Sequence, residues 1–145
     1  ARPEQKRLFT VFLEACRAHA AAASRREAAP IEVLLEGLVP VVRLNRPAAR
    51  NAFSTAMAEM LAGTIEALGK DPTVSAIVVT GAGGAFSSGG DLDVMRALAD
   101  AGDVDGFRDL LLAGGRAVIA MAEAPRPVLA ALDGAAAGGG LSLAL

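Results

Sequence analysis

The chain has 145 residues, of which 53% are hydrophobic and 21% are charged, and its formal net charge is −2. This length allows one domain with a sizeable core, and the small negative charge gives no electrostatic basis for binding nucleic acid. One cysteine excludes an intrachain disulfide, and one cysteine with one histidine gives no metal-site signature. The most apolar stretch, residues 127–145, is interrupted by Asp133 and four glycines. We therefore expect a soluble, cytoplasmic protein without a bound metal ion.

The first 30 residues differ in pattern from the rest of the chain. Leu8, Phe12 and Ala15 recur at helical spacing, which predicts an amphipathic helix over residues 3–23. Residues 24–30 are polar and end in proline, which is typical of a linker. We expect residues 1–30 to be a helical extension and linker that serve in docking or oligomerisation. The core would then span residues 31–145.

The core begins with a predicted hairpin. Two short apolar runs, at residues 31–35 and 38–44, flank the turn pair Glu36-Gly37. Pro40 lies inside the second run. Because proline lacks an amide hydrogen, this position predicts either an edge strand or a strand that starts later than the apolar pattern suggests.

The elements after the hairpin alternate between helix and strand. Ser54 or Thr55 is expected to cap a helix that runs to about residue 68. Further along, we expect a strand at 76–80, a short helix at 92–98, a polar loop at 100–103, a helix at 104–121, a strand at 128–132 and a helix starting after Gly138. This alternation predicts an α/β fold.

Two glycine-rich turns, at residues 86–92 and 137–141, each lie between a strand-like run and a helix-like run. Glycine lacks a Cβ atom, so a ligand can closely approach its amide, and the start of a helix adds a positive dipole end. Two such amides that converge on one oxygen would form an oxyanion hole. Either turn alone is also typical of an ordinary connection between a strand and a helix.

Four motifs occur in order along residues 31–145. They are Asn45-Arg46-Pro47 with Asn51-Ala52-Phe53, Ile77-Val78-Val79-Thr80-Gly81, Ala85-Phe86-Ser87-Ser88-Gly89-Gly90-Asp91-Leu92, and Arg126-Pro127-Val128-Leu129-Ala130-Ala131 with Gly134 and Gly138-Gly139-Gly140. In this order and at this spacing they resemble the enoyl-CoA hydratase/isomerase (crotonase) superfamily. The resemblance implies a spiral of strand-strand-helix repeats, truncated to its N-terminal half, and an acyl thioester of coenzyme A as substrate. Coenzyme A would be part of the substrate, and no separate cofactor is expected.

The resemblance also assigns site residues. It implies that the amides of Gly90 and Gly139 form the oxyanion hole, and that the substrate lies against Ala52, Ser88, Asp91, Leu92 and Asp93. Asp91 also suits the N-cap of the helix that follows it. Arg46 and Arg50 could contact the phosphates of coenzyme A, because arginine suits phosphate geometry, and a plain surface role fits them equally.

Ser142 departs from the family pattern. Hydratases of this family carry a catalytic glutamate at the second position after the triple glycine, where this chain has serine. Hydration needs a water activated and a proton delivered by positioned groups. The resemblance therefore favours an isomerase of fatty acid metabolism over a hydratase, assembled as a trimer or hexamer. The alternative is a noncatalytic, truncated module for coenzyme A binding or oligomerisation, because the second family glutamate would lie beyond Leu145.

Overall fold

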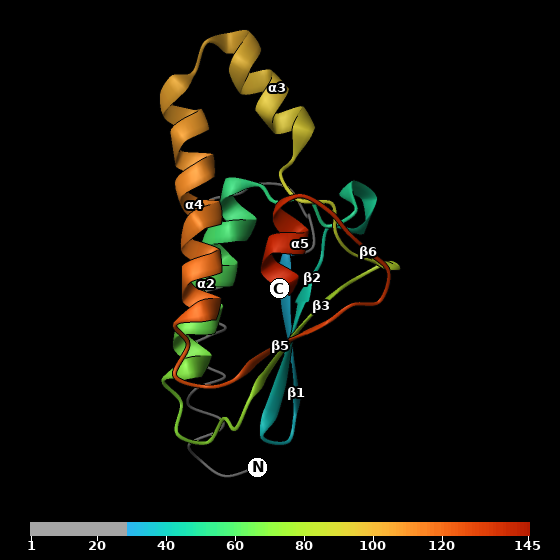
Figure 1. The fold of residues 1–145 in the computed structure, drawn as a ribbon, viewed down its shortest axis with the longest axis vertical. Helices are drawn as coiled ribbons and strands as arrows, with labels where there is room; N and C mark the ends of the chain where they lie inside the picture. Colours follow the sequence, from blue (N-terminus) through green and yellow to red (C-terminus); the bar gives the residue numbers. More distant parts are fainter. Residues whose placement is uncertain (1–28) are drawn as a thin grey trace.

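Three successive strand-strand-helix units make up residues 29–145, the part of the chain that the computed structural model describes (Figure 1). The first unit holds β1 (Ile31–Glu36), β2 (Val39–Leu44), the 3-10 helix η1 (Pro47–Ala49) and α2 (Thr55–Gly69). The second holds β3 (Ile77–Gly81), β4 (Ala85–Ser87), α3 (Leu92–Ala101) and α4 (Val104–Ala122). The third holds β5 (Val128–Ala131), β6 (Ala135–Ala136) and α5 (Gly139–Ala144). This confirms the predicted α/β class and its repeat, while the helix expected at residues 3–23 lies outside the described residues.

The larger sheet has the strand order β1-β2-β3-β5, in which only the β1–β2 pair is antiparallel. Successive side chains of a strand point to opposite faces, and Val42 and Leu44 of β2 share a buried face with Ile77 and Val79 of β3. Helices α2 and α4 lie side by side over this sheet (Figure 1). No helix within residues 29–145 is long and apolar enough to cross a membrane.

Helix α2 forms as its sequence predicts. The Ser54 hydroxyl accepts a hydrogen bond from the Met57 amide at 3.3 Å, which satisfies one amide of the first turn. Met57, Leu61 and Ile65 follow at four-residue spacing and are fully buried. Their spacing places them on one helix face, so burial of this stripe fixes α2 against the sheet.

Pro40 does not mark an edge strand. It is the second residue of β2, which lies between β1 and β3, and it pairs in register with Leu35 of β1. The prediction of an edge was wrong because pairing with β3 starts only at Val41. The missing amide hydrogen therefore lies outside the β2–β3 ladder.

The link between α3 and α4 is shorter than the predicted loop at 100–103. Helix α3 continues to Ala101, and Gly102 ends it in the left-handed region with φ 65°. The carboxylate of Asp103 then accepts a hydrogen bond from the Gly106 amide at 2.8 Å, which caps α4. Figure 1 shows α3 and the first turns of α4 extending together beyond the sheet. A glycine and an aspartate thus suffice for the whole turn.

Two glycines offer a direct test of this packing. A Cβ atom at Gly81 would lie 1.9 Å from the carbonyl oxygen of Ala85, whereas one at Gly63, on the exposed side of α2, would meet nothing within 4 Å. We expect Gly81→Ala to lower the free energy of unfolding by about 2–3 kcal/mol. Gly63→Ala should raise it by about 0.5–1 kcal/mol, because alanine favours helix. Urea denaturation measures both, and equal effects would contradict the described β3–β4 turn.

Candidate active site

Pairing between β4 and β6 brings the two glycine-rich turns together. These short strands run parallel, with Ala85 opposite Ala135 and Ser87 opposite Ala136. The Ala137 amide extends the contact by donating to the Ser87 carbonyl at 3.0 Å. Because the carboxyl ends of parallel strands meet at the same edge of a sheet, the turns that follow β4 and β6 lie side by side.

Close backbone contacts between the turns require glycine at two positions. A Cβ atom at Gly89 would lie 2.8 Å from both the Gly139 nitrogen and the Ala137 oxygen. A Cβ atom at Gly140 would lie 2.4 Å from the Ser87 oxygen. Gly89 also has φ 89°, a region that side chains rarely adopt. The first turn and the start of α5 are thus packed backbone against backbone.

The amides of Gly90 and Gly139 are left without acceptors by this packing. Within residues 29–145, neither donates a hydrogen bond to the protein. Gly139 is the first residue of α5, where an amide has no partner inside the helix. At the other turn, the Gly89 carbonyl accepts a hydrogen bond from the Phe53 amide at 2.7 Å. Because C=O and N–H point in opposite directions in a trans peptide, the Gly90 N–H points away from Phe53.

A network of buried polar groups supports the first glycine-rich turn, residues 86–92. Asn51 is fully buried with φ 55°, a left-handed conformation that asparagine tolerates better than most residues. Its side-chain amide donates to the carbonyls of Ala82 and Ala85 at 2.9 and 2.8 Å. The Ser87 hydroxyl donates to the Asn51 carbonyl at 2.8 Å and accepts from the Gly89 amide at 3.1 Å. No local pattern in the sequence predicts these roles of Asn51 and Ser87.

Asp91 caps α3, as predicted, and also forms an ion pair with Arg46. Its carboxylate accepts hydrogen bonds from the amides of Asp93 and Val94, both at 3.2 Å. Arg46 Nη1 donates to the same carboxylate at 2.8 Å and to the carbonyl of Ala52 at 2.5 Å. Burial raises the pKa of Asp91, but the hydrogen bond and charge of Arg46 and the helix amides outweigh this effect. The pKa therefore lies below its ordinary value of 3.8.

The other predicted site residues divide into buried and exposed groups. Ala52 is buried beside the first turn, and the Ser88 amide donates to the Arg50 carbonyl at 3.0 Å, so these residues lie with the turn. Leu92 is 72% exposed, and the side chain of Asp93 is 94% exposed.

Within residues 29–145, no group of three histidine, cysteine or acidic side chains is placed to hold a metal ion.

Ser142 is exposed on α5, and its hydroxyl donates to the Gly138 carbonyl at 3.4 Å. The acceptor is thus the N-cap residue of the same helix. Ser142 lies about one helical turn after Gly139, whose amide is unbonded.

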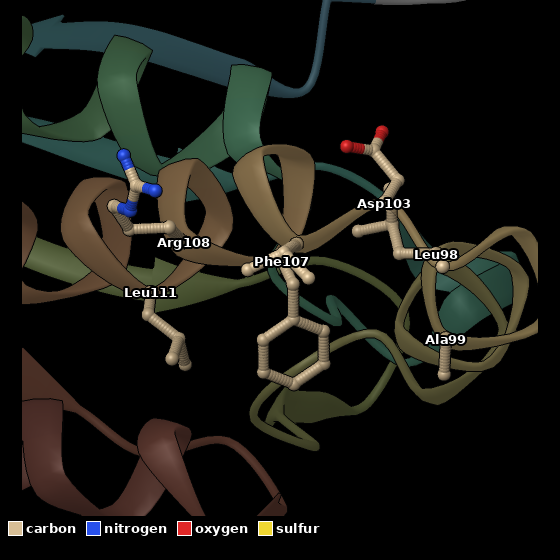
Figure 2. Close-up of a pocket in the computed structure, with 8 residues that line it drawn as sticks. Leu98, Ala99, Asp103, Phe107, Arg108 and Leu111 are labelled. Atoms are coloured by element: carbon tan, nitrogen blue, oxygen red, sulfur yellow. The ribbon is translucent and has the colours of Figure 1, made fainter.

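A separate apolar hollow of about 490 Å³ lies where α3 meets α4. Figure 2 shows Phe107 and Leu111 projecting from the same side of α4, with Leu98 of α3 nearby. With a helix rise of 1.5 Å per residue, Leu98 and Ala99, the α3 residues that line it, lie roughly 9–11 Å along the helix from its start at Leu92. The hollow is therefore distinct from the glycine turns.

The Asp91 ion pair predicts a pH dependence of stability. A carboxylate whose pKa is lowered on folding contributes stability above the unfolded-state pKa and loses it as the pH falls through the folded-state pKa. Near neutral pH, Asp91→Asn should therefore be less stable than the wild type by about 1–3 kcal/mol. The difference should shrink below pH 3.8, as wild-type Asp91 takes up a proton. Urea denaturation across this range measures it, and a gap that stays constant would contradict the pairing.

Comparisons with known proteins show which family this chain resembles. The sequence model described as enoyl-CoA hydratase/isomerase matches residues 35–145. The Mycobacterium tuberculosis protein named "Probable enoyl-CoA hydratase EchA14" is 39% identical over 116 residues, covering 80% of this chain and 44% of the relative. The trans-2-decenoyl-acyl-carrier-protein isomerase of Streptococcus mutans is 33% identical over 107 residues, covering 74% of this chain and 41% of the relative. The chain thus spans less than half the length of these relatives.

Solved structures agree with the sequence comparison. Pseudomonas aeruginosa PA4980 superposes with a TM-score of 0.77 at 29% identity, over 83% of this chain and 51% of that chain. Pseudomonas aeruginosa AtuE gives a TM-score of 0.72 at 35% identity, over 79% of this chain and 44% of that chain. The glycine turns lie within the matched residues 35–145. The chain therefore belongs to the enoyl-CoA hydratase/isomerase family.

Proposed function

We propose that this chain binds an acyl-CoA thioester and stabilises its enolate oxygen between the amides of Gly90 and Gly139. The observation that carries the proposal is the pair of adjacent turns, each with an unbonded backbone amide. When a proton leaves the carbon next to a thioester carbonyl, negative charge develops on the carbonyl oxygen. Two preorganised amides would stabilise that charge, and loss of one such donor typically costs on the order of 3 kcal/mol.

The named activities of the relatives support a thioester substrate. They include enoyl-CoA hydratases, an enoyl-acyl-carrier-protein isomerase and a 3-hydroxyisobutyryl-CoA hydrolase. These reactions differ in what attacks or leaves, but each acts on an acyl thioester. A pair of amides that binds the thioester oxygen would serve all of them. This shared requirement is why we assign the glycine turns to the carbonyl and not to a particular acyl group.

We favour isomerase chemistry over hydration. By the family resemblance, hydratases carry a catalytic glutamate where this chain has Ser142, and a neutral hydroxyl is a poor general base near neutral pH. Asp91 already accepts hydrogen bonds from Arg46 and the start of α3. We therefore assign no described residue to proton transfer, and propose that these residues supply oxyanion stabilisation.

Arg50 remains our candidate for the phosphates of coenzyme A. It is exposed, follows η1, and its carbonyl accepts a hydrogen bond from the Ser88 amide of the first turn. A guanidinium at this position could bind phosphate while the thioester reaches the glycine turns. Coenzyme A would enter as part of the substrate.

A homo-oligomer is also proposed, with support from exposed apolar side chains of α4. Leu111, Leu112 and Ile119 are 55%, 63% and 56% exposed, although they lie on the longest described helix. Apolar surface of this kind often marks an interface between proteins.

Replacement of Gly139 by proline tests the oxyanion proposal. Proline removes the amide hydrogen yet suits the first position of a helix. Gly139→Ala keeps the hydrogen, and its Cβ atom would contact Gly89 Cα at an ordinary 3.9 Å. The probe is acetoacetyl-CoA, whose enolate absorbs in the near ultraviolet, bound to the protein expressed at its full natural length. We expect Gly139→Pro to lower the enolate-to-keto ratio of bound ligand about 100-fold, and Gly139→Ala to lower it much less. Equal ratios in wild type and Gly139→Pro would refute the proposal.

The serine at position 142 predicts weak hydratase activity. The full-length protein should hydrate crotonyl-CoA well below roughly 10 s⁻¹, the median turnover of enzymes. Loss of the conjugated enoyl absorbance measures this rate. Turnover at or above that value would show that another group activates water, and would remove the preference for an isomerase.

A further inference from the structure

Arg46 links the Gly90 turn to the neighbouring segment at Ala52. Its Nη1 atom donates both to the Asp91 carboxylate at 2.8 Å and to the Ala52 carbonyl at 2.5 Å. The Asp91 side chain is only 9% exposed, and that of Arg46 is 29% exposed. Since charge-assisted bonds in such surroundings are stronger and more directional than neutral ones, this contact restrains Asp91 relative to Ala52.

The orientation of the Gly90 amide depends on the same two segments. The Phe53 amide donates to the Gly89 carbonyl at 2.7 Å, and the Asp91 amide donates to the Phe53 carbonyl at 3.2 Å. These two bonds hold the peptide groups on either side of the Gly90 Cα atom. Because the Gly89 carbonyl and the Gly90 N–H belong to one planar peptide, a shift of Asp91 relative to Phe53 would rotate the Gly90 N–H.

The charge of Arg46 matters in the same place. Asp91 directly follows Gly90 in the chain, so its backbone adjoins the proposed oxyanion donor. An unpaired carboxylate there would repel the charge that develops in the reaction. The guanidinium neutralises that carboxylate and orders it at the same time.

We propose that Arg46 is a positioning residue for the oxyanion hole: through Asp91 it fixes the direction of the Gly90 amide, and it does not bind the phosphates of coenzyme A. This inference rests on the proposed function. Arg46 would therefore affect the bound enolate indirectly, through Asp91 and the Gly90 peptide.

Two ligands separate positioning from binding of the coenzyme. Acetoacetyl-CoA reports the enolate-to-keto ratio, and butyryl-CoA, which enolises little, reports affinity for the coenzyme A thioester itself. In the full-length protein, Arg46→Gln should lower the enolate-to-keto ratio about tenfold or more, with butyryl-CoA affinity changed less than about twofold. Arg46→Lys should restore part of the ratio, because lysine keeps the charge but not the planar fork.

Asp91→Asn and a distant arginine complete the variant set. Asp91→Asn should lower the ratio, and the double variant with Arg46→Gln should be no worse than the more affected single variant, because both disrupt one contact. Arg116→Gln is the matched control: Arg116 of α4 pairs with Glu66 of α2 at 3.1 Å, without contact to the turns. Arg116→Gln should change neither the enolate-to-keto ratio of bound acetoacetyl-CoA nor the affinity for butyryl-CoA. If Arg46→Gln does not fold, Asp91→Asn, which retains an oxygen for the cap, carries the same test.

Each outcome decides between the claims. A wild-type protein that gives no enolate signal would overturn both the proposed function and this inference. A wild-type signal that Arg46→Gln, Arg46→Lys and Asp91→Asn all preserve would overturn the inference alone. A parallel loss of enolate signal and butyryl-CoA affinity would show that Arg46 binds the coenzyme, and would also overturn it.

Discussion

Parallel pairing of β4 with β6 is the contact on which the candidate site depends. The two strands have only three and two residues, too few to be stable alone. They follow β3 and β5, whose parallel pairing in the larger sheet starts them in a common direction. The bond from the Ala137 amide to the Ser87 carbonyl then carries the alignment into the turns. The hydrophobic core thus positions the two glycine turns indirectly, through the register of a neighbouring sheet.

Most of the buried polar residues support the first glycine-rich turn, residues 86–92. Three of the four buried polar residues within residues 29–145 are Asn51, Ser87 and Asp91, and each contributes to a bond that supports the 87–91 segment. Burying such groups is unfavourable unless they are hydrogen-bonded, and here each is. The Gly90 amide, in contrast, has no acceptor among the described residues. This contrast between saturated supporting groups and one unbonded amide is what the proposed binding of an oxyanion requires.

The sequence predicted the larger elements, because the signals for those features are local. Ser54 and Asp91 cap helices in place, and the apolar periodicity gave α2 and α4 to within a residue or so. Strands β4 and β6 were missed because two or three residues are too few to show a period. Of the two alternatives for Pro40, the edge position was wrong, because the position of Pro40 relative to the β2–β3 ladder depends on tertiary register. The Arg46–Asp91 pair joins residues 45 positions apart, and no local pattern predicts such a contact.

The central claim is that the amides of Gly90 and Gly139 bind one thioester oxygen. The most direct measurement is a crystal structure of the full-length protein with an unreactive acyl-CoA analogue that retains the thioester carbonyl. The carbonyl oxygen should lie about 2.7–3.1 Å from both nitrogens. A carbonyl bound elsewhere, with either amide directed away from it, would show that the two amides do not form an oxyanion hole.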